Sequence, residues 1–413
     1  MKRIINIAVF VLMAIEVNAQ TITYGSFMKA VAEKNISYLA EKHNIDVAEA
    51  NVQASKVFND PELSVTYTNN QDWNLKMGQG VDVELSYNLD LTGVRRNRIR
   101  VARTEKEMSN AVLSVFFSSL RLEAAKAWAE AWRLKECCRV MGESLEDLMQ
   151  IAKSDSLRLS VGDINRTDAT QSRLEAQMLN GELSILKAQF KNALLSLSRL
   201  CGGEPISDIE DGPLPEEEPV LNVDQLLKKA LSLRADLKAA ELQKTLSEQN
   251  VRLLKASRSF EMGITLGYSY SNTVRNEIAP APSFNSLSVG VSIPLKFSSM
   301  NKGALYSAKI QAEQSRRYYD EACLQVHTET MQAYNSYLAV SSVARRYDSS
   351  VLTEAKGIAE ARKEGYLKGE SSLVEMLSAQ QTFREVMTGY IESSANRYLS
   401  VAELEYAAGG SLR

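Results

Sequence analysis

The side chains that most often carry catalysis are sparse in this chain. Its only histidines, His43 and His327, lie far apart in unrelated helical patterns. No nucleophile, metal-ligand or phosphate-binding motif accompanies them. With 51 acidic residues among 413, a pair of carboxylates alone carries little information. The sequence therefore argues against an enzyme and predicts no cofactor and no metal site.

Cysteine chemistry is the other candidate. Cys137 and Cys138 are adjacent and could form a redox pair, while Cys201 and Cys323 stand alone. None of them has CxxC spacing, and all four fall inside helical patterns. Helix thiols are the favoured interpretation, so packing rather than a disulfide framework must hold the chain together.

Two acidic residues stand in a strand instead. Asp82 and Glu84 belong to the run 81–89, in which polar and apolar residues alternate. Three further runs alternate in the same way, at 62–69, 261–270 and 287–295. Period two directs the polar residues to one face of each strand and the apolar residues to the other.

The apolar face of these strands favours a membrane barrel over a soluble half-buried sheet, which shows the same alternation. This face carries Tyr67, Tyr87, Tyr268 and Tyr270, as the aromatic girdles of membrane barrels do. Strands of about nine or ten residues also suit a tilted crossing of a bilayer. In a barrel, Asp82 and Glu84 would face a wet lumen.

The start of the chain indicates export. Lys2 and Arg3 precede an apolar run from Ile4 to Ile15, and small residues follow near position 19. Residues 1–19 are therefore predicted to be a signal peptide. No later window approaches the ~18 apolar residues of a spanning helix. The net charge of -3 argues against a nucleic-acid partner.

The rest of the chain is duplicated. Gly162-Asp163 recurs as Gly369-Glu370, 207 residues later, and the strand pairs recur at a similar offset. The predicted organisation is a first repeat at 20–201, a proline-rich linker at 202–221, a second repeat at 222–409 and a tail at 410–413. Each repeat is expected to contain a helix (21–57 or 222–258), two strands and two long helices.

The long helices have no place in a compact domain. Proline-free stretches run from Gly93 to about Arg158 and from Met300 to Gly365, about 100 Å each if helical. Return helices, expected at 163–201 and 371–408, carry apolar residues at heptad-like spacing, which is typical of coiled coils. The predicted fold class is mainly α with a small β part.

Four strands cannot close a barrel, because the smallest membrane barrels have about 8. Open strand edges in lipid leave backbone groups unpaired. Several chains must therefore share one barrel. Two chains would supply 8 strands and three would supply 12, and strand counting does not choose between them.

Strand pairs, long helices, duplication and export together resemble the TolC family of outer-membrane efflux proteins. Specific segments carry the resemblance: Arg234-Ala235-Asp236-Leu237, the strand-to-helix junction Ser292-Ile293-Pro294-Leu295, and the turn from Tyr366 through Gly369 to Gln380. The resemblance implies a homotrimer in the outer membrane, with a shared 12-stranded barrel and a periplasmic helical tunnel. It also implies a passive exit duct, opened by a periplasmic adaptor (membrane fusion) protein and an inner-membrane pump of RND or ABC type.

The resemblance also implies where the duct closes. The helix turns at Gly162 and Gly369 would form its periplasmic tip, and a repeated glycine suits a helix-ending turn with positive φ. Glu375 falls where the family places an acidic ring facing the pore. Tyr366 and Asp168 correspond to partners in a closed-state tether, whose additional arginine is replaced by Ser371 here.

Two further expectations complete the interpretation. Arg95, Arg96 and Arg98 lie where strand meets helix and are expected to meet phosphates of outer-membrane lipid or carboxylates at the membrane interface. The alternative to a channel is a periplasmic coiled-coil protein with a structural or interaction role. That alternative explains the helices but not four amphipathic strands at duplicated positions.

Overall fold

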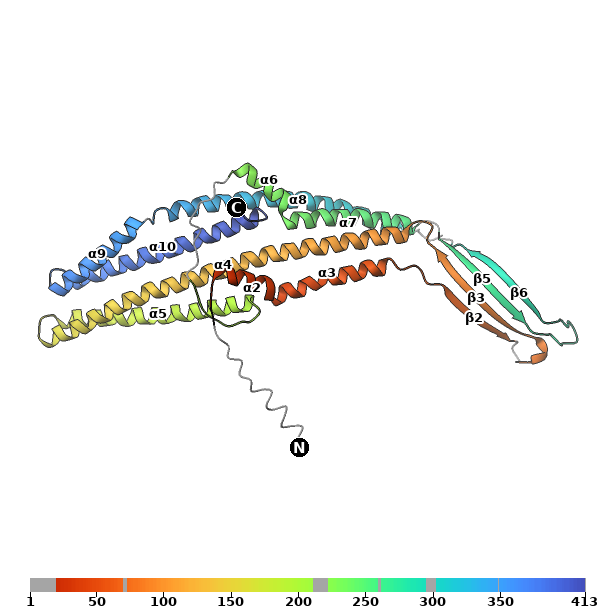
Figure 1. The fold of residues 1–413 in the computed structure, drawn as a ribbon, viewed down its shortest axis with the longest axis horizontal. Coiled ribbons are helices and arrows are strands. Elements are labelled where there is room, and N and C mark those ends of the chain that lie inside the picture. The colour runs from red at the N-terminus through yellow and green to blue at the C-terminus, as the bar shows by residue number, and fades with distance from the viewer. Residues whose placement is uncertain are drawn as a thin grey trace, which may run out of the picture. The chain divides into compact units, whose positions relative to one another are not determined.

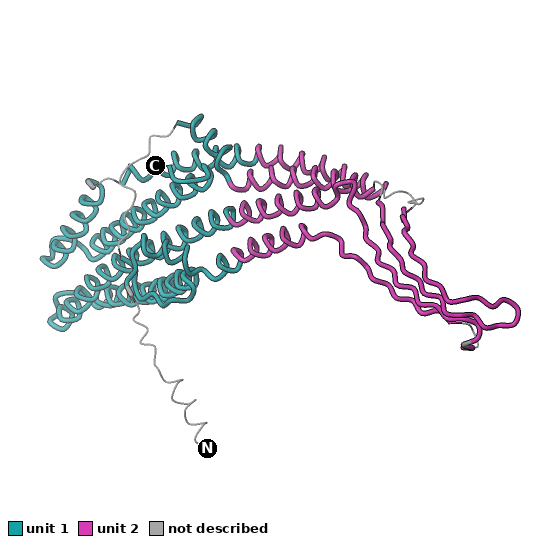
Figure 2. The backbone as a smooth tube through the Cα atoms, turned by 45° about the vertical axis from the view of Figure 1, so that its right-hand side comes forward, with its two compact units in different colours: residues 1–40, 114–234, 325–413 teal, residues 41–113, 235–324 magenta. Residues whose placement is uncertain are grey.

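The computed structural model describes residues 20–69, 73–210, 222–258, 261–294, 302–347 and 349–412. The predicted signal peptide and most of the predicted linker lie outside these residues. The chain divides into two compact units, and each takes segments from both predicted repeats (Figure 2). One unit holds residues 1–40, 114–234 and 325–413, and the other holds 41–113 and 235–324. The predicted repeat boundaries themselves stay a prediction.

Helices dominate the fold (Figure 1). They are α2 (Tyr24–Lys34), α3 (Ile36–Ser55), α4 (Val94–Ser160), α5 (Arg166–Leu200), α6 (Val223–Leu233), α7 (Ala235–Ser257), α8 (Lys302–Ala344), α9 (Ser349–Lys368) and α10 (Leu373–Ala407). The strands are β1 (Gln20–Ile22), β2 (Glu62–Asn69), β3 (Gln79–Leu89), β4 (Ile206–Ile209), β5 (Met262–Ser271) and β6 (Phe284–Ser292). No described helix is both long and apolar enough to cross a membrane.

The first long helix is confirmed, whereas the second is divided. Helix α4 runs unbroken for 67 residues. The stretch predicted as one helix from Met300 to Gly365 instead forms α8 and α9, which are separated between Ala344 and Ser349. The serines that begin α9 are residue types that compete with the helical backbone and favour helix ends.

The predicted helices 21–57 and 222–258 are each divided too, at corresponding places. Asn35 separates α2 from α3, and Arg234 separates α6 from α7, both with extended backbone. A glycine with positive φ packs on each break: a Cβ on Gly202 would lie 2.5 Å from the carbonyl oxygen of Lys34, and one on Gly409 would lie 2.9 Å from the nitrogen of Arg234. Each return helix therefore ends against the break in the helix that begins its repeat.

Four strands form one antiparallel sheet in the order β2-β3-β5-β6. The register places the predicted faces together across the whole sheet. One row crosses it as Val65, Val83, Tyr268 and Leu287, and the next as Thr66, Asp82, Ser269 and Ser286. The apolar row is open to solvent in the single chain, with Leu287 at 86% and Val65 at 65% exposed.

The polar row is internally connected. The hydroxyl of Ser269 donates to the carboxylate of Asp82, and Glu84 lies on the same face, opposite Gly267. Among the described strands, β2 and β6 each have a single neighbour in this sheet. That Asp82 and Glu84 line a barrel lumen stays a prediction, but their common face is confirmed.

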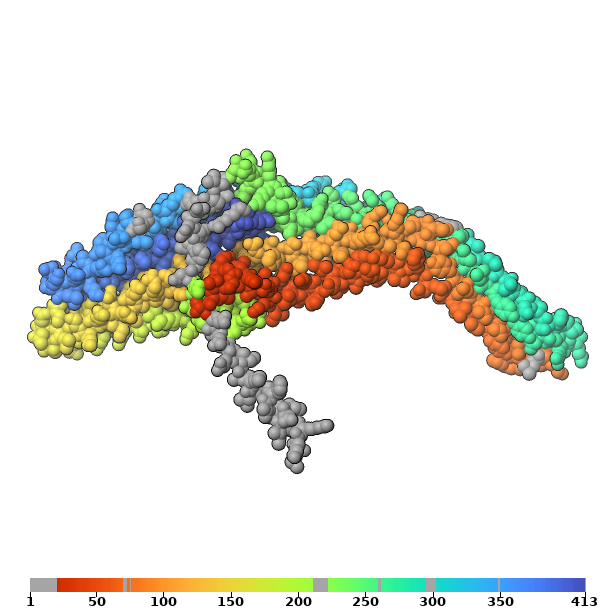
Figure 3. Space-filling model, in the orientation of Figure 1, coloured from red at the N-terminus to blue at the C-terminus, as the bar shows by residue number. Residues whose placement is uncertain are grey.

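Helices follow the strands in the same lateral order. Lys106 of α4 pairs with Glu49 of α3. The hydroxyl of Thr104 on α4 donates to Gln249 of α7 at 3.0 Å, and the hydroxyls of Ser247 and Ser315 join α7 to α8 at 2.8 Å. In the space-filling view α3 and α4 lie side by side (Figure 3), and a recess lined by both helices remains between them. In this unit α3 and α8 are thus the outer members of the helical layer.

The other unit contains the packed core. Phe27 of α2 and Trp128 of α4 are buried together with Leu197 of α5, their two rings 5.3 Å apart. A second cluster joins α4 and α5 through Leu148 and Leu183. The predicted coiled-coil packing of the return helix on α4 is therefore confirmed, and Trp128 is a core residue.

All four cysteines are free. Burial raises the pKa of Cys137 to about 11, and it does the same for Cys201. Both groups therefore stay as thiols at neutral pH, which makes them poor nucleophiles. The interpretation of Cys137 and Cys138 as unpaired helix thiols is confirmed.

Candidate functional site

The first predicted turn joins α4 to α5. Gly162 has a φ of 77°, and the Asp163 amide donates to the carbonyl of Arg158 at 2.9 Å. The Arg158 guanidinium also bonds the Asp163 carboxylate at 2.7 Å. Because a Cβ on Gly162 would meet nothing within 4 Å, the backbone conformation and not lack of space favours glycine here.

The second turn, between α9 and α10, has the same design. Gly369 has a φ of 80°, and the Glu370 amide donates to the carbonyl of Gly365 at 2.7 Å. The positive φ expected of both glycines is confirmed. Their position at a periplasmic tip stays a prediction.

Asp168 and Glu375 occupy the same position in the helix that follows each turn. Asn165 caps α5: its side chain accepts from the Asp168 amide at 2.8 Å and donates to the Asp168 carboxylate at 2.9 Å. Ser372 caps α10, accepting from the Glu375 amide while Glu375 accepts from the Ser372 amide at 3.1 Å. The cap of α10 is a reciprocal capping box, in which both side chains accept from backbone amides at the helix start. In α5 only the Asn165 side chain accepts from a backbone amide, while the Asp168 carboxylate holds the Asn165 side chain in place.

The sequence itself carries a signal for these helix caps, which the prediction of the turns did not use. A capping residue followed by an acid three positions later is readable in the sequence, at Asn165 and at Ser372. The acids are therefore duplicated at least in part because two helices must start. Glu375 also lies 3.8 Å from Arg362 of α9, and both side chains remain about half exposed, so its carboxylate stays accessible. A pore-facing role for Asp168 and Glu375 stays a prediction.

Tyr366 makes a buried contact between the two repeats, near their turns. Its hydroxyl donates to Asp155 of α4 at 2.8 Å, and Asp155 is completely buried. Around them pack Ile151, Leu373 and Met376. Burial, the hydrogen bond to Asp155 and the charge of that carboxylate raise the pKa of Tyr366 well above its usual value. The phenol therefore stays protonated and can donate.

The predicted partner of Tyr366 was wrong within the chain: it is Asp155 and not Asp168. Asp155 was missed because it follows no glycine turn. Its signal is its place on the apolar face of α4, after Leu148 and Ile151, which are both 1% exposed. An acid in a buried seam needs a hydrogen-bond donor, and that requirement could have pointed to a tyrosine.

A second polar link joins the same two helices. The ammonium of Lys363 on α9 pairs with the carboxylate of Asp147 on α4. The Arg158 guanidinium also lies 5.5 Å from the Tyr366 ring centroid. One oxygen of Asp155 is buried without a partner, so this buried carboxylate is held by a single hydrogen bond. Near the two turns, α9 is thus joined to α4 by one buried hydrogen bond and one ion pair.

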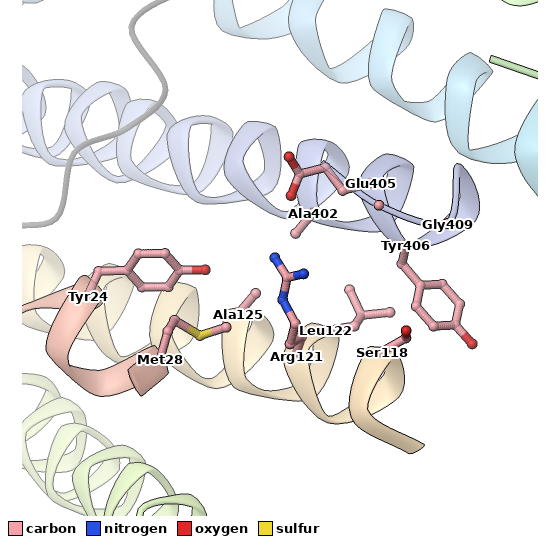
Figure 4. A pocket seen from close by; sticks show the side chains of 11 residues that line it. Tyr24, Met28, Ser118, Arg121, Leu122, Ala125, Ala402, Glu405, Tyr406 and Gly409 are labelled. Atoms are coloured by element: carbon pink, nitrogen blue, oxygen red, sulfur yellow. The ribbon is translucent and has the colours of Figure 1, made fainter. Parts of the chain in front are cut away.

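A separate recess lies between α2, α4 and α10 (Figure 4). Figure 4 shows Arg121 rising from α4 toward α10, with Tyr24 from α2 on one side and Tyr406 from α10 on the other. Its volume is about 80 Å³, so it is a small recess. In the described parts of the chain, no three His, Cys, Asp or Glu side chains come together to hold a metal ion.

Comparison with protein families and curated relatives identifies similar proteins. Residues 226–410 match the family model described as outer membrane efflux protein. The chain is 22% identical over 392 residues to the cobalt-zinc-cadmium resistance protein CzcC of Cupriavidus metallidurans, covering 95% of this chain and 91% of that one. It is 20% identical to the outer membrane efflux protein BepC of Brucella suis, over 95% and 86% of the two chains.

Solved structures share the fold at lower identity. The Campylobacter jejuni CmeC outer membrane channel superimposes with a TM-score of 0.77 at 15% identity, over 94% of this chain and 85% of that one. The Vibrio cholerae outer membrane protein VceC gives 0.73 at 16% identity, over 94% and 97%. The shared fold is mostly helical, and its barrel is closed by three chains rather than by one.

Proposed function

Since residues 226–410 match the outer membrane efflux protein family and curated relatives of that kind align over 95% of the chain, we propose that this chain is a TolC-family outer-membrane efflux protein. Three copies would form a passive exit duct whose periplasmic end opens when an adaptor and an inner-membrane pump engage it. Members of the family are channels rather than enzymes, and they lie in the outer membrane with a periplasmic helical extension. The pump class, RND or ABC, is part of the proposal.

One observation carries the proposal above all others. The sheet presents an apolar row that crosses all four strands and is exposed at Val65, Tyr268 and Leu287, and its two outer strands lack a second neighbour among the described residues. Neither feature is stable alone in water or in lipid. Copies joined edge to edge would pair every strand and turn the apolar row to lipid. A periplasmic coiled-coil protein has no use for such a sheet.

The helical layer supports the same edge-to-edge closure. Its outer members are α3 and α8, so β6 and α8 of one copy would meet β2 and α3 of the next. The free side of α3 presents two small residues, Ala50 and Ala54, and the free side of α8 presents Tyr306 and Ile310. Small residues facing large ones interdigitate well.

Disulfide trapping tests this arrangement. The double variant Ala54→Cys/Tyr306→Cys should form covalent trimers on mild oxidation, because the two positions approach each other only between copies. Each single variant is the control and should stay monomeric in denaturing gels. Fractionation completes the test: the wild type should be an outer-membrane, heat-modifiable trimer, whereas a soluble rod would support the coiled-coil alternative.

The proposed gate is the contact between Tyr366 and Asp155, together with the pair formed by Lys363 and Asp147. These bonds hold α9 against α4 close to the two helix turns. An adaptor that contacts the turns could compete for them and let α9 move. Asp168 and Glu375, at the starts of the return helices, are proposed to supply carboxylates to the narrowed channel.

Cargo is proposed from a relative alone. CzcC is named a cobalt-zinc-cadmium resistance protein, so divalent cations are the first cargo to test here. Deleting the gene should lower the cobalt, zinc and cadmium concentrations that arrest growth, and reintroducing it should restore them. Unchanged metal tolerance with lowered tolerance of organic drugs would redirect the proposal to drugs.

A further inference from the structure

The start of α4 carries positive charge, whereas a helix start usually favours negative charge. Its first turn contains Arg95 and Arg96 and no acidic residue, although the positive end of a helix dipole disfavours cations. Part of the explanation is local. Arg95 donates to the carbonyl of Lys56 at 2.7 Å, and Arg98 donates to those of Ser55 and Val57 at 3.3 and 2.9 Å.

Those bonds change the expectation for this junction. Arg95 and Arg98 satisfy carbonyls that the end of α3 leaves free, so these two residues are committed inside the chain. Of the three arginines expected to meet lipid, only Arg96 remains available.

Arg96 is the first of an exposed arginine stripe, which comprises Arg96, Arg100 and Arg103. The spacing of four and then three residues places them on one face of α4, and all three side chains are exposed. In the part of the chain that the structure describes, Arg96 and Arg103 have no hydrogen bond or ion pair, and Arg100 reaches only Asn97 at 3.4 Å.

A fourth cation lies at the same level on the neighbouring helix. The bond between Thr104 and Gln249 sets the register of the antiparallel helices α4 and α7. In that register Arg252, three residues beyond Gln249, lies level with Arg100, and it too is exposed. Four arginines at one level of two neighbouring helices make this surface positive, so the arrangement favours a ligand that brings negative charge.

The surroundings indicate which ligand. The apolar row of β3 ends at Leu89, and exposed apolar side chains continue beyond it at Phe58 and Leu91, 64% and 58% exposed. The Arg95 guanidinium lies 3.9 Å from the centroid of the Phe58 ring. Apolar surface followed by arginines is the order that a membrane–water interface selects.

The dimensions agree with an interface. From Arg96 to Arg103 the helix rises about 10 Å. The headgroup layer on one side of a bilayer is roughly 5–7 Å thick, and arginine side chains can extend toward it from either edge. An open helix face has no walls to enclose a free anion, but it matches a plane of phosphates.

We propose that the arginine stripe binds the phosphodiesters of anionic phospholipids in the periplasmic leaflet of the outer membrane, with Arg252 contributing beside it. The proposal rests on the orientation of the sheet given under Proposed function. Arginine suits this role because its guanidinium can hold two phosphate oxygens at once and stays charged. The stripe would thereby set the depth at which the helical part meets the membrane.

The test replaces Arg96, Arg100 and Arg103 with glutamine in the full-length trimer. A matched control replaces Arg173, Lys187 and Lys191 of α5, which are exposed cations in the other unit, so both variants lose the same charge. Trimers extracted from native membranes would be weighed by mass spectrometry with their retained lipids. We expect the stripe variant to retain about five-fold less phosphatidylglycerol and cardiolipin, with phosphatidylethanolamine unchanged and the control like the wild type.

Two competitor arms separate the ligand sources. Added phosphatidylglycerol should exchange with the retained lipid, whereas added inorganic phosphate should not displace it. Displacement by phosphate alone would mean that the stripe is a free-anion site and would overturn the proposal. So would equal lipid loss in the control variant.

Ion selectivity provides the remaining test. If the stripe instead lined the channel, the variant would shift the reversal potential toward cations in a planar bilayer and keep its lipids, which would overturn the proposal. Should the triple variant fail to assemble, Arg103→Gln alone should still lower retention. If the proposed function itself were wrong, the wild type would be neither trimeric nor in the outer membrane, so that failure can be told apart from failure of the lipid proposal.

Discussion

The four-stranded sheet and the pair of helix turns differ in how far one chain completes them. The sheet leaves two outer strands with a single neighbour and an apolar row open to solvent. The turns have their amides capped, and a hydrogen bond joins Tyr366 to a buried carboxylate. The sheet therefore lacks partners that other copies could supply, whereas a change at the turns would have to break bonds within the chain.

The largest expected effect comes from charging the sheet. Val289 lies in the middle of β6 and is 78% exposed in the single chain. Val289→Lys should cost about 2–4 kcal/mol in each copy if that face meets lipid. The heat-modifiable trimer should then disappear from outer-membrane fractions.

Its neighbour provides the control. Ser288 belongs to the opposite, polar face, where it lies across from Gly267. Ser288→Lys should leave the trimer intact. Equal loss in both variants would mean that the two faces do not differ in environment, and the proposed barrel would have to be abandoned.

The next effect separates the turns from the sheet. Tyr366→Phe removes the hydroxyl that donates to Asp155 and leaves a buried carboxylate without that bond, at a cost of about 1–3 kcal/mol. Single-channel recordings should show open events about ten-fold more often or more, because 1.4 kcal/mol corresponds to a factor of ten. The control Tyr318→Phe alters an exposed ring on α8, and an increase there as well would exclude a specific latch.

Two acids allow a finer comparison of capping with pore charge. Glu375→Gln and Asp168→Asn keep an oxygen that can cap the helix but remove the carboxylate charge. Stability should therefore change by less than about 1 kcal/mol, while block of the channel by divalent cations should weaken several-fold. Unchanged block would leave both residues with a capping role alone.

The smallest effect is a pH dependence. The pKa of Tyr366 is raised above its ordinary value of 10.0, by burial first and then by its bond to Asp155. Its contribution to the closed contact is therefore complete below pH 10 and declines as the pH rises toward the elevated pKa. Channel opening of the wild type should increase above pH 10. The Tyr366→Phe variant should show a smaller increase, because it has no phenol to ionise. An identical increase in both proteins would argue against a role for Tyr366 in the pH dependence.

The strands were predictable because their signal is local. Period two was visible in each run, and the register then brought Asp82 and Ser269 onto one face without further information. The number of chains in the barrel was not predictable from the strands, because closure depends on surfaces that meet only in the assembly. It came from the family resemblance.

The turns were predictable in position but not in detail. Repetition identified Gly162 and Gly369, and distance from these glycines selected the capping acids Asp168 and Glu375. The partner of Tyr366 instead depends on which face of a 67-residue helix is buried, and Asp155 lies eight residues before the Asp163 turn. Helix breaks were missed for a similar reason, since Gly202 and Gly409 act on Lys34 and Arg234 from far along the sequence.

The division between α8 and α9 has a mechanical consequence. Helix α4 is continuous, but its counterpart is jointed, and at the joint Tyr347 lies so close to α10 that a Cβ on Gly389 would be 2.6 Å from its hydroxyl. A 20-residue arm is about 30 Å long, so a swing of about 10° at the joint would carry its far end about 5 Å. The repeat that carries Tyr366 is thus the one whose long helix is divided, whereas the long helix of the first repeat is continuous.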